Sequence, residues 1–223
     1  MSDNPILNGL FFLLKGGPVM WPLFLCAIIS VAVMIERFIS ITRAAKDNEG
    51  LLDLIREMLE QGHVKEAQKL ADEAAGPVAQ LIASGLHASH MDADAIERQM
   101  EELALREQPV LYKRLGVLDT VITLSPLLGL LGTVTGMIRA FHVVGTQGLN
   151  GATAITGGVA EALIATATGL AIAIVTLVGY NYLTEKVKEI IADMEIRATQ
   201  LMNILIGLRA KEGRAGEAAT LRA

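Results

Sequence analysis

The residue of this sequence whose type and position best suit it to a chemical role is Glu161, a carboxylic acid directly before a long apolar stretch. Residues 162–184, which follow it, contain no Asp, Glu, Lys or Arg. An ionised side chain at the centre of a bilayer costs about 2.5 to 3.5 kcal/mol on insertion scales, so such residues face water or a partner. Two readings stay open: an ion-pathway carboxylate inside the membrane, or a carboxylate at the outer rim that favours a helix N-terminus.

Three windows without charged residues could position this carboxylate. Gly16–Ile35, Thr120–Ile138 and Ala162–Thr184 each have about the 20 residues that a helix needs to cross a bilayer. This pattern excludes a single soluble globule. The N-terminus carries Asp3 and has no basic residue before Lys15, so we expect the first window to be a retained span and not a cleaved signal.

The distribution of basic residues predicts the orientation of the spans. Seventeen of the 19 Lys and Arg residues lie in two segments, which the positive-inside bias assigns to the cytoplasm. The expected order is a periplasmic or interfacial segment (1–15), a first span (16–39), a cytoplasmic helical region (40–115), a second span (116–144), a periplasmic turn (145–151), a third span (152–184), a cytoplasmic helix (185–211) and a disordered tail (212–223). The expected fold is therefore an all-α membrane protein with long cytoplasmic helices.

Other polar groups fall at similar depth in the second and third spans. Thr133 lies about as far before the predicted turn as Glu161 lies after it, roughly 15 Å along a helix. Arg139 lies six residues before the predicted turn and so closer to it than either residue. It is a candidate charge partner for Glu161, or an arginine that snorkels to the interface. On a straight helix Glu161 shares a face with Thr168, whereas Thr166 lies about 140° round.

Small and hydroxyl residues are frequent in these two spans. Gly132 and Gly136 have the G-x-x-x-G spacing that lets helix backbones approach closely, and close packing suggests a multi-helix assembly. We assign helix packing to Gly129, Gly132, Gly136 and Gly169. A threonine hydroxyl in a membrane helix commonly bonds a carbonyl of its own helix, which is the alternative to an ion-pathway role.

Composition argues against several other functions. The net charge of −5 gives no reason to expect a nucleic-acid partner. Cys26 is the single cysteine, the four histidines lack metal-ligand spacing, and neither a G-x-S-x-G motif nor a Walker loop occurs. His87 and His90 are three residues apart, but solvated helix positions explain them better than a metal site. We expect no enzyme, no cofactor and no metal.

Three strings of this sequence resemble the MotA/TolQ/ExbB proton channel family, and within it the three-span ExbB and TolQ type. They are SPLLGLLGTVTGMIRAF from Ser125, GGVAEALIATATGLAIAIVTLVGYNYL from Gly157, and GGPVMWPL with Glu36-Arg37 at the end of the first span. The resemblance covers essentially the whole chain, the cytoplasmic middle by pattern only. The family's functional positions match Glu161 in AEAL, pore threonines Thr133 and Thr166, and an Asn at the inner end of the last span, Asn181.

The resemblance implies an assembly in the bacterial inner membrane. It implies a ring of copies of this subunit, a pentamer, around single-span ExbD- or TolR-like helices that bring a titrating aspartate. A TonB- or TolA-like energy transducer is a further expected partner, with membrane lipids around the ring. Glu161 and the threonines would support a hydrated proton path, and loading and release of the partner's carboxylate would drive rotation.

Two alternatives remain at this point. The chain could be a structural scaffold that positions a single-span partner without conducting ions. It could also be the sodium-driven version of the same motor, because a hydroxyl-rich lining serves either ion. The residues do not identify the client process, which could be siderophore import, envelope maintenance or gliding. They do not determine the ring stoichiometry either.

Overall fold

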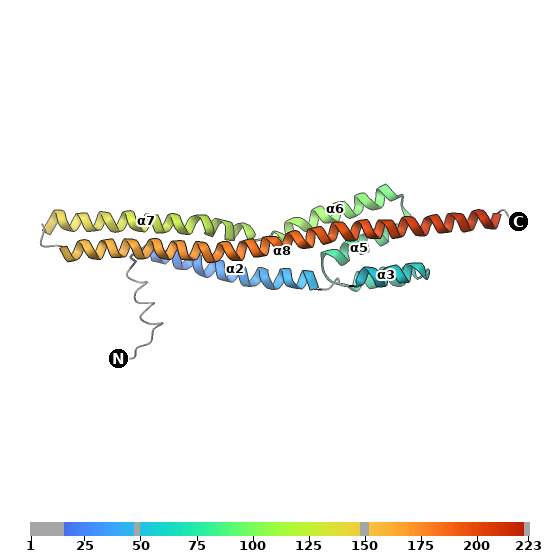
Figure 1. Cartoon of the computed structure of the whole chain (residues 1–223), viewed down its shortest axis with the longest axis horizontal. Helices are drawn as coiled ribbons and strands as arrows, with labels where there is room; N and C mark the ends of the chain where they lie inside the picture. The colour runs from blue at the N-terminus through green and yellow to red at the C-terminus, as the bar shows by residue number, and fades with distance from the viewer. Residues whose placement is uncertain (1–15, 47–49, 148–151, 221–223) are drawn as a thin grey trace, which may run out of the picture. The chain divides into compact units, whose positions relative to one another are not determined.

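The computed structural model describes residues 16–46, 50–147 and 152–220 (Figure 1). All regular secondary structure within them is helical, which confirms the expected all-α fold. Residues 1–15, for which we expected an interfacial segment, lie outside the described residues. The chain divides into two compact units, one of Met1–Arg37 with Arg114–Leu183, the other of Phe38–Lys113 with Thr184–Ala223.

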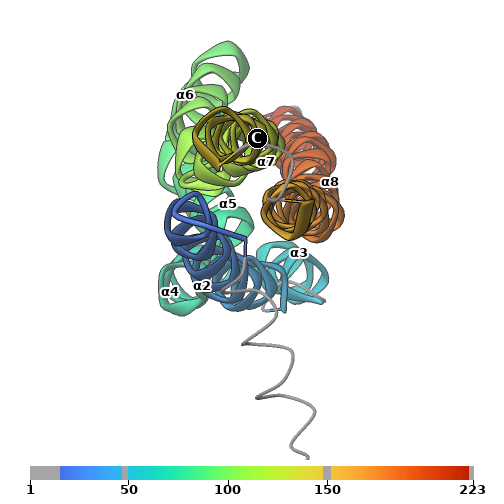
Figure 2. The ribbon, with the colours of Figure 1, turned by 90° about the vertical axis from the view of Figure 1, so that its left-hand side faces the viewer.

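The first unit contains three helical segments. They come from α2 (Met20–Lys46), α7 (Leu115–Gln147) and the N-terminal part of α8 (Ala152–Thr220). Helices α7 and α8 lie side by side in both views (Figures 1 and 2). A small apolar core joins α2 to α8, formed by Val19, Met20, Leu23 and Ala165, with Phe24, Leu128 and Ile172 packed against it.

Much of the outer surface of this unit is apolar. Exposed large side chains occur on all three helices, and they include Trp21, Leu25, Ile28, Leu127, Leu130, Phe141, Leu163, Ile174 and Val178. Three described helical stretches, Met20–Ala45, Ala93–Thr146 and Ile155–Lys211, are long and apolar enough to cross a membrane. Since soluble monomers rarely expose so large an apolar surface, a lipid environment explains this pattern.

The second unit is a cluster of short helices with the end of α8. Helices α3 (Leu51–Glu60), α4 (Val64–Glu73) and α5 (Pro77–His87) pack in sequence, followed by η1 (Ala88–His90) and α6 (Ala93–Leu111). Its buried side chains include Leu52, Ile55, Leu59, Leu81, Ile82, Leu86, Ile96, Met100, Met194 and Leu201. The amphipathic continuation of the third span past Glu185 supplies the α8 members of this core.

Local chemistry explains where the short helices begin and end. Gly62 and Gly76 have φ of 83° and 103°, which an L-residue adopts only with strain, and each separates two helices. Pro77 occupies the first turn of α5, where its missing N–H costs nothing. The Asp92 carboxylate caps α6 by accepting the Ala95 N–H at 3.1 Å.

Two helices continue past the ends expected for them. Helix α7 continues through Gln147, into the segment expected as a periplasmic turn, whose remaining residues 148–151 lie outside the described part. Helix α8 continues through Thr220, beyond residue 211 and into the segment expected as a disordered tail. A turn at residues 112–114, where Arg114 has φ of 64°, separates α6 from α7.

Candidate ion-pathway site

Glu161 on α8 forms an ion pair with Arg139 on α7. Arg139 Nη1 donates a hydrogen bond to Glu161 Oε1 at 2.6 Å, the length of a strong charge-assisted bond. The Glu161 side chain is 21% exposed and the Arg139 side chain 51% exposed. The structure therefore gives the carboxylate a partner of opposite charge on the neighbouring helix, which lowers the cost of keeping it ionised in apolar surroundings.

A third segment also reaches this carboxylate. Gly17, just before α2, has φ of 75° and lies so close to Glu161 that a Cβ atom built on it would overlap Oε1. The Gly17 carbonyl accepts the Met20 N–H at 3.1 Å and so begins the first turn of α2. Gly17, at the start of the first span, and Arg139, on the second span, therefore both lie against the carboxyl group of Glu161 on the third span.

The candidate threonines bind backbone carbonyls. Thr166 Oγ1 on α8 donates to the Gly129 carbonyl of α7 at 3.0 Å and so joins two spans. Thr133 and Thr168 donate within their own helices, to Leu130 O at 2.6 Å and Ile164 O at 2.8 Å. Each hydroxyl oxygen keeps lone pairs that can still accept a hydrogen bond from water. Asn181, near the C-terminal end of the expected third span, is exposed.

The glycines lie where α7 and α8 approach most closely. A Cβ atom on Gly129 would lie 3.0 Å from Thr166 Cα, and one on Gly136 would lie 2.8 Å from the Gly158 carbonyl oxygen. A Cβ atom on Gly132 would overlap Ala165 Cβ, and one on Gly169 would overlap the Ser125 carbonyl oxygen. Three of these contacts are to backbone atoms and the Gly132 contact is to the small side chain of Ala165, so larger residues at the glycine positions would separate the helices.

Sequence reasoning missed two features of this unit. The first is Gly17, which lies against a side chain far away in the sequence; the GGP string of residues 16–18 was the available signal. The second is an ion pair between Glu36 Oε2, on α2, and Arg114 Nη1, just before α7, at 3.2 Å.

The histidines have local structural partners. His87 Nε2 lies 3.0 Å from Asp72 Oδ1 and joins α5 to α4, and His63 Nδ1 lies 3.3 Å from Glu66 Oε2. Among the described residues there is no group of three or more His, Cys, Asp or Glu that could hold a metal ion.

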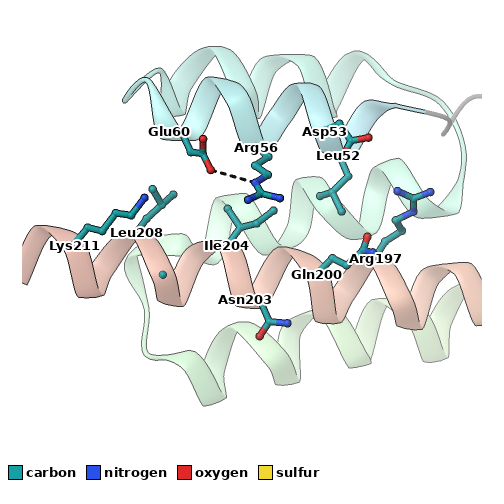
Figure 3. Close-up of a pocket in the computed structure, with 11 residues that line it drawn as sticks. Leu52, Asp53, Arg56, Glu60, Arg197, Gln200, Asn203, Ile204, Leu208 and Lys211 are labelled. Carbon is teal, nitrogen blue, oxygen red and sulfur yellow. Dashed lines mark hydrogen bonds and ion pairs between the residues drawn. The ribbon is translucent and has the colours of Figure 1, made fainter.

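A groove in the second unit lies between α3 and α8 (Figure 3). Its volume is about 550 Å³, and its polar lining includes Arg56, Glu60, Arg197 and Lys211. Arg56 Nε pairs with Glu60 Oε1 at 3.1 Å, and Arg197 Nε pairs with Asp193 Oδ1 at 3.2 Å. Both arginines are therefore engaged by carboxylates of their own helices, and the groove shares no lining residue with the Glu161 site.

Comparisons with known proteins give the sequence context of this site. Residues 73–196 match the family model of the MotA/TolQ/ExbB proton channel family. The chain is 31% identical over 170 residues to the putative biopolymer transport protein ExbB-like 3 of Synechocystis sp., a match that covers 75% of this chain and 81% of that protein. It is 26% identical over 214 residues to the biopolymer transport protein ExbB of Neisseria meningitidis, covering 90% of this chain and 92% of that protein.

A third relative is matched over a smaller part of its length. The chain is 30% identical over 146 residues to the putative biopolymer transport protein ExbB homolog of Methanothermobacter thermautotrophicus. That match covers 66% of this chain and 52% of the relative, so the chain spans about half the length of this relative.

Proposed function

Because this chain belongs to the MotA/TolQ/ExbB proton channel family, we propose that it is the channel-forming subunit of an ion-driven motor in the bacterial inner membrane. The family is one of membrane channel subunits and not of enzymes. The observation that carries the proposal is Glu161, a carboxylate on an apolar helix that is held against Arg139 on the neighbouring helix. Such an ionisable group inside a membrane segment marks an ion pathway by default.

The proposed assembly is a ring of copies of this chain, a pentamer, around a single-span partner of the ExbD or TolR type. Its intramembrane aspartate would be the carrier that loads and releases the proton, and a TonB- or TolA-like transducer would pass the motion on. Two relatives have names that describe them as biopolymer transport proteins, which supports an envelope transport process as the client.

In this proposal the chain forms the wall of the pathway. Glu161 supplies a fixed negative charge beside the path and favours the approach of a cation. The hydroxyl oxygens of Thr133, Thr166 and Thr168 accept hydrogen bonds from water, because each O–H is already donated to a carbonyl. The close glycine contacts between α7 and α8 hold this wall rigid while the central partner moves.

The proposed topology places the N-terminus in the periplasm and the C-terminus in the cytoplasm. The enrichment of Lys and Arg in residues 36–119 and 185–223 supports it through the positive-inside bias. The cytoplasmic side would then hold the C-terminal ends of α2 and α8 and the whole of α3 to α6.

Flux measurements in liposomes test the proposal. The full chain is reconstituted with its single-span partner, and proton entry is followed with an internal pH dye. We expect partner-dependent flux that Glu161→Ala and Glu161→Gln abolish while co-purification with the partner persists. Glu102→Gln, which changes an exposed carboxylate on α6, is the matched control and should keep wild-type flux.

The same liposomes separate the alternatives. A scaffold that does not conduct gives no partner-dependent flux under either a pH or a sodium gradient. A sodium-driven motor gives flux with the sodium gradient alone. Full flux in Glu161→Ala would reject the role proposed for this carboxylate.

A further inference from the structure

We propose that Gly17 is a positioning residue for Glu161, and that the absence of a side chain at position 17 creates the space in which the carboxylate sits. The inference deepens the proposed function and rests on the role of Glu161 in it. It also makes the segment just before α2 part of the ion site.

The geometry at Gly17 leaves no room for a side chain. A Cβ atom there would overlap Glu161 Oε1 and would lie 2.7 Å from Cδ and 3.2 Å from Cγ. Three successive atoms of one side chain thus pack against the Gly17 backbone. The φ of 75° adds a second restriction, because L-residues reach this conformation only with strain.

The same carboxylate oxygen is also bound by Arg139. Oε1 accepts the hydrogen bond from Arg139 Nη1 at 2.6 Å and is also the atom closest to the Gly17 Cβ position. A side chain at position 17 would therefore push the carboxylate off its present position relative to the guanidinium. Gly17 and Arg139 together determine where the charge of Glu161 lies.

The neighbouring glycine provides a matched control. A Cβ atom on Gly16 would meet Met20 Sδ at 2.6 Å, Met20 Cγ at 2.8 Å and Ile164 Cγ2 at 3.2 Å. The methionine side chain is flexible and can move away. Gly16→Ala therefore adds the same methyl group at the same turn without touching Glu161.

A double-mutant cycle tests whether the contact with Glu161 is the reason for glycine at position 17. Thermal unfolding of the detergent-purified full chain is measured for wild type, Gly17→Ala, Glu161→Ala and the double variant. We expect the Tm loss caused by Gly17→Ala to fall to about half or less when Glu161 is absent, since contacting residues are not additive. An equal Tm loss in both backgrounds means backbone strain alone and overturns the proposal.

Two further variants keep the test decisive if Gly17→Ala folds poorly. Glu161→Asp withdraws the carboxylate by one methylene, so Gly17→Ala with Glu161→Asp should fold better than Gly17→Ala alone. Gly17→Asn tolerates a positive φ but still overlaps Glu161, so it should be no better than Gly17→Ala. Failure of Glu161→Asp to improve folding, or wild-type behaviour of Gly17→Asn, contradicts the proposal.

Flux through partner-containing liposomes gives the functional readout. Gly17→Ala should lower flux by about tenfold or more, because it displaces the fixed charge of Glu161 from the path and small misplacements of a functional group have large effects on rate. Gly16→Ala should retain most of the flux. Wild-type flux in Gly17→Ala overturns the proposal. Absence of flux in the wild-type protein rejects the proposed function, whereas the stability cycle still decides the position of Glu161 independently.

Discussion

Thr166 on α8 donates its hydroxyl to the carbonyl oxygen of Gly129 on α7, at 3.0 Å. The resemblance implied a pore threonine at this position, and helical geometry alone placed it about 140° away from the face of Glu161. The hydrogen bond between helices gives Thr166 a structural task, and its oxygen lone pairs remain available to water.

Replacement of Thr166 separates these two roles. Thr166→Val removes the interhelical bond and should destabilise the protein by about 1 kcal/mol, the usual net value of one hydrogen bond. Thr166→Ser should retain both the bond and the flux. Thr168→Val, which loses only a bond to its own helix, is the control and should have a smaller effect in the same detergent unfolding assay. Equal losses in the two valine variants would contradict the role of the Gly129 contact.

Removal of Arg139 should expose the cost of an unpaired Glu161. We expect Arg139→Leu to destabilise the chain by about 1 to 3 kcal/mol, between the values for exposed and buried ion pairs, because the carboxylate is only 21% exposed. Arg139→Leu combined with Glu161→Leu should regain most of the loss in chemical unfolding. The control is Arg106→Leu, which breaks an exposed pair with Glu102 on one helix and should cost less than about 0.5 kcal/mol.

Enlargement of the glycines between α7 and α8 should separate these helices. Gly132→Ala would bring a methyl group onto Ala165 Cβ, and we expect a loss of about 1 to 3 kcal/mol, the range for overpacked cores. Gly145→Ala is the control on the same helix, because its Cβ would meet nothing within 4 Å. Thermal unfolding should show a loss for Gly132→Ala and no loss, or a small gain, for Gly145→Ala. The reverse order would mean that the close contact does not exist in the membrane.

The cap of α6 can be tested in the second unit. Asp92→Ala removes the side-chain acceptor for the Ala95 N–H and should reduce the stability of the full chain by about 1 kcal/mol. Asp92→Asn should restore most of it, since asparagine caps helices well. Asp94→Ala removes a nearby charge without a capping bond and should have a smaller effect, as measured by hydrogen exchange of the first turn of α6.

The sequence by itself determined the fold class, the family and the three apolar spans. Desolvation of a charge is costly wherever it occurs in a bilayer, so the uncharged windows are visible without knowledge of the packing. Gly62, Gly76 and Asp92 are equally local signals, because a positive φ and a helix cap involve only neighbouring residues. The end of α8 at Thr220, nine residues beyond the helix expected at 185–211, was not visible in the same way, because small polar residues are compatible with either a helix or a coil.

The tertiary structure alone decided which group each polar atom meets. Arg139 pairs with Glu161 across 22 residues, and Thr166 bonds Gly129 across 37 residues. The sequence was equally compatible with an Arg139 that snorkels to the membrane interface, and with a Thr166 that bonds a carbonyl of its own helix. Gly17 is farther still from Glu161 along the chain. Which partner a polar group meets depends on the rotation and spacing of the packed helices, and the close glycine contacts determine that spacing.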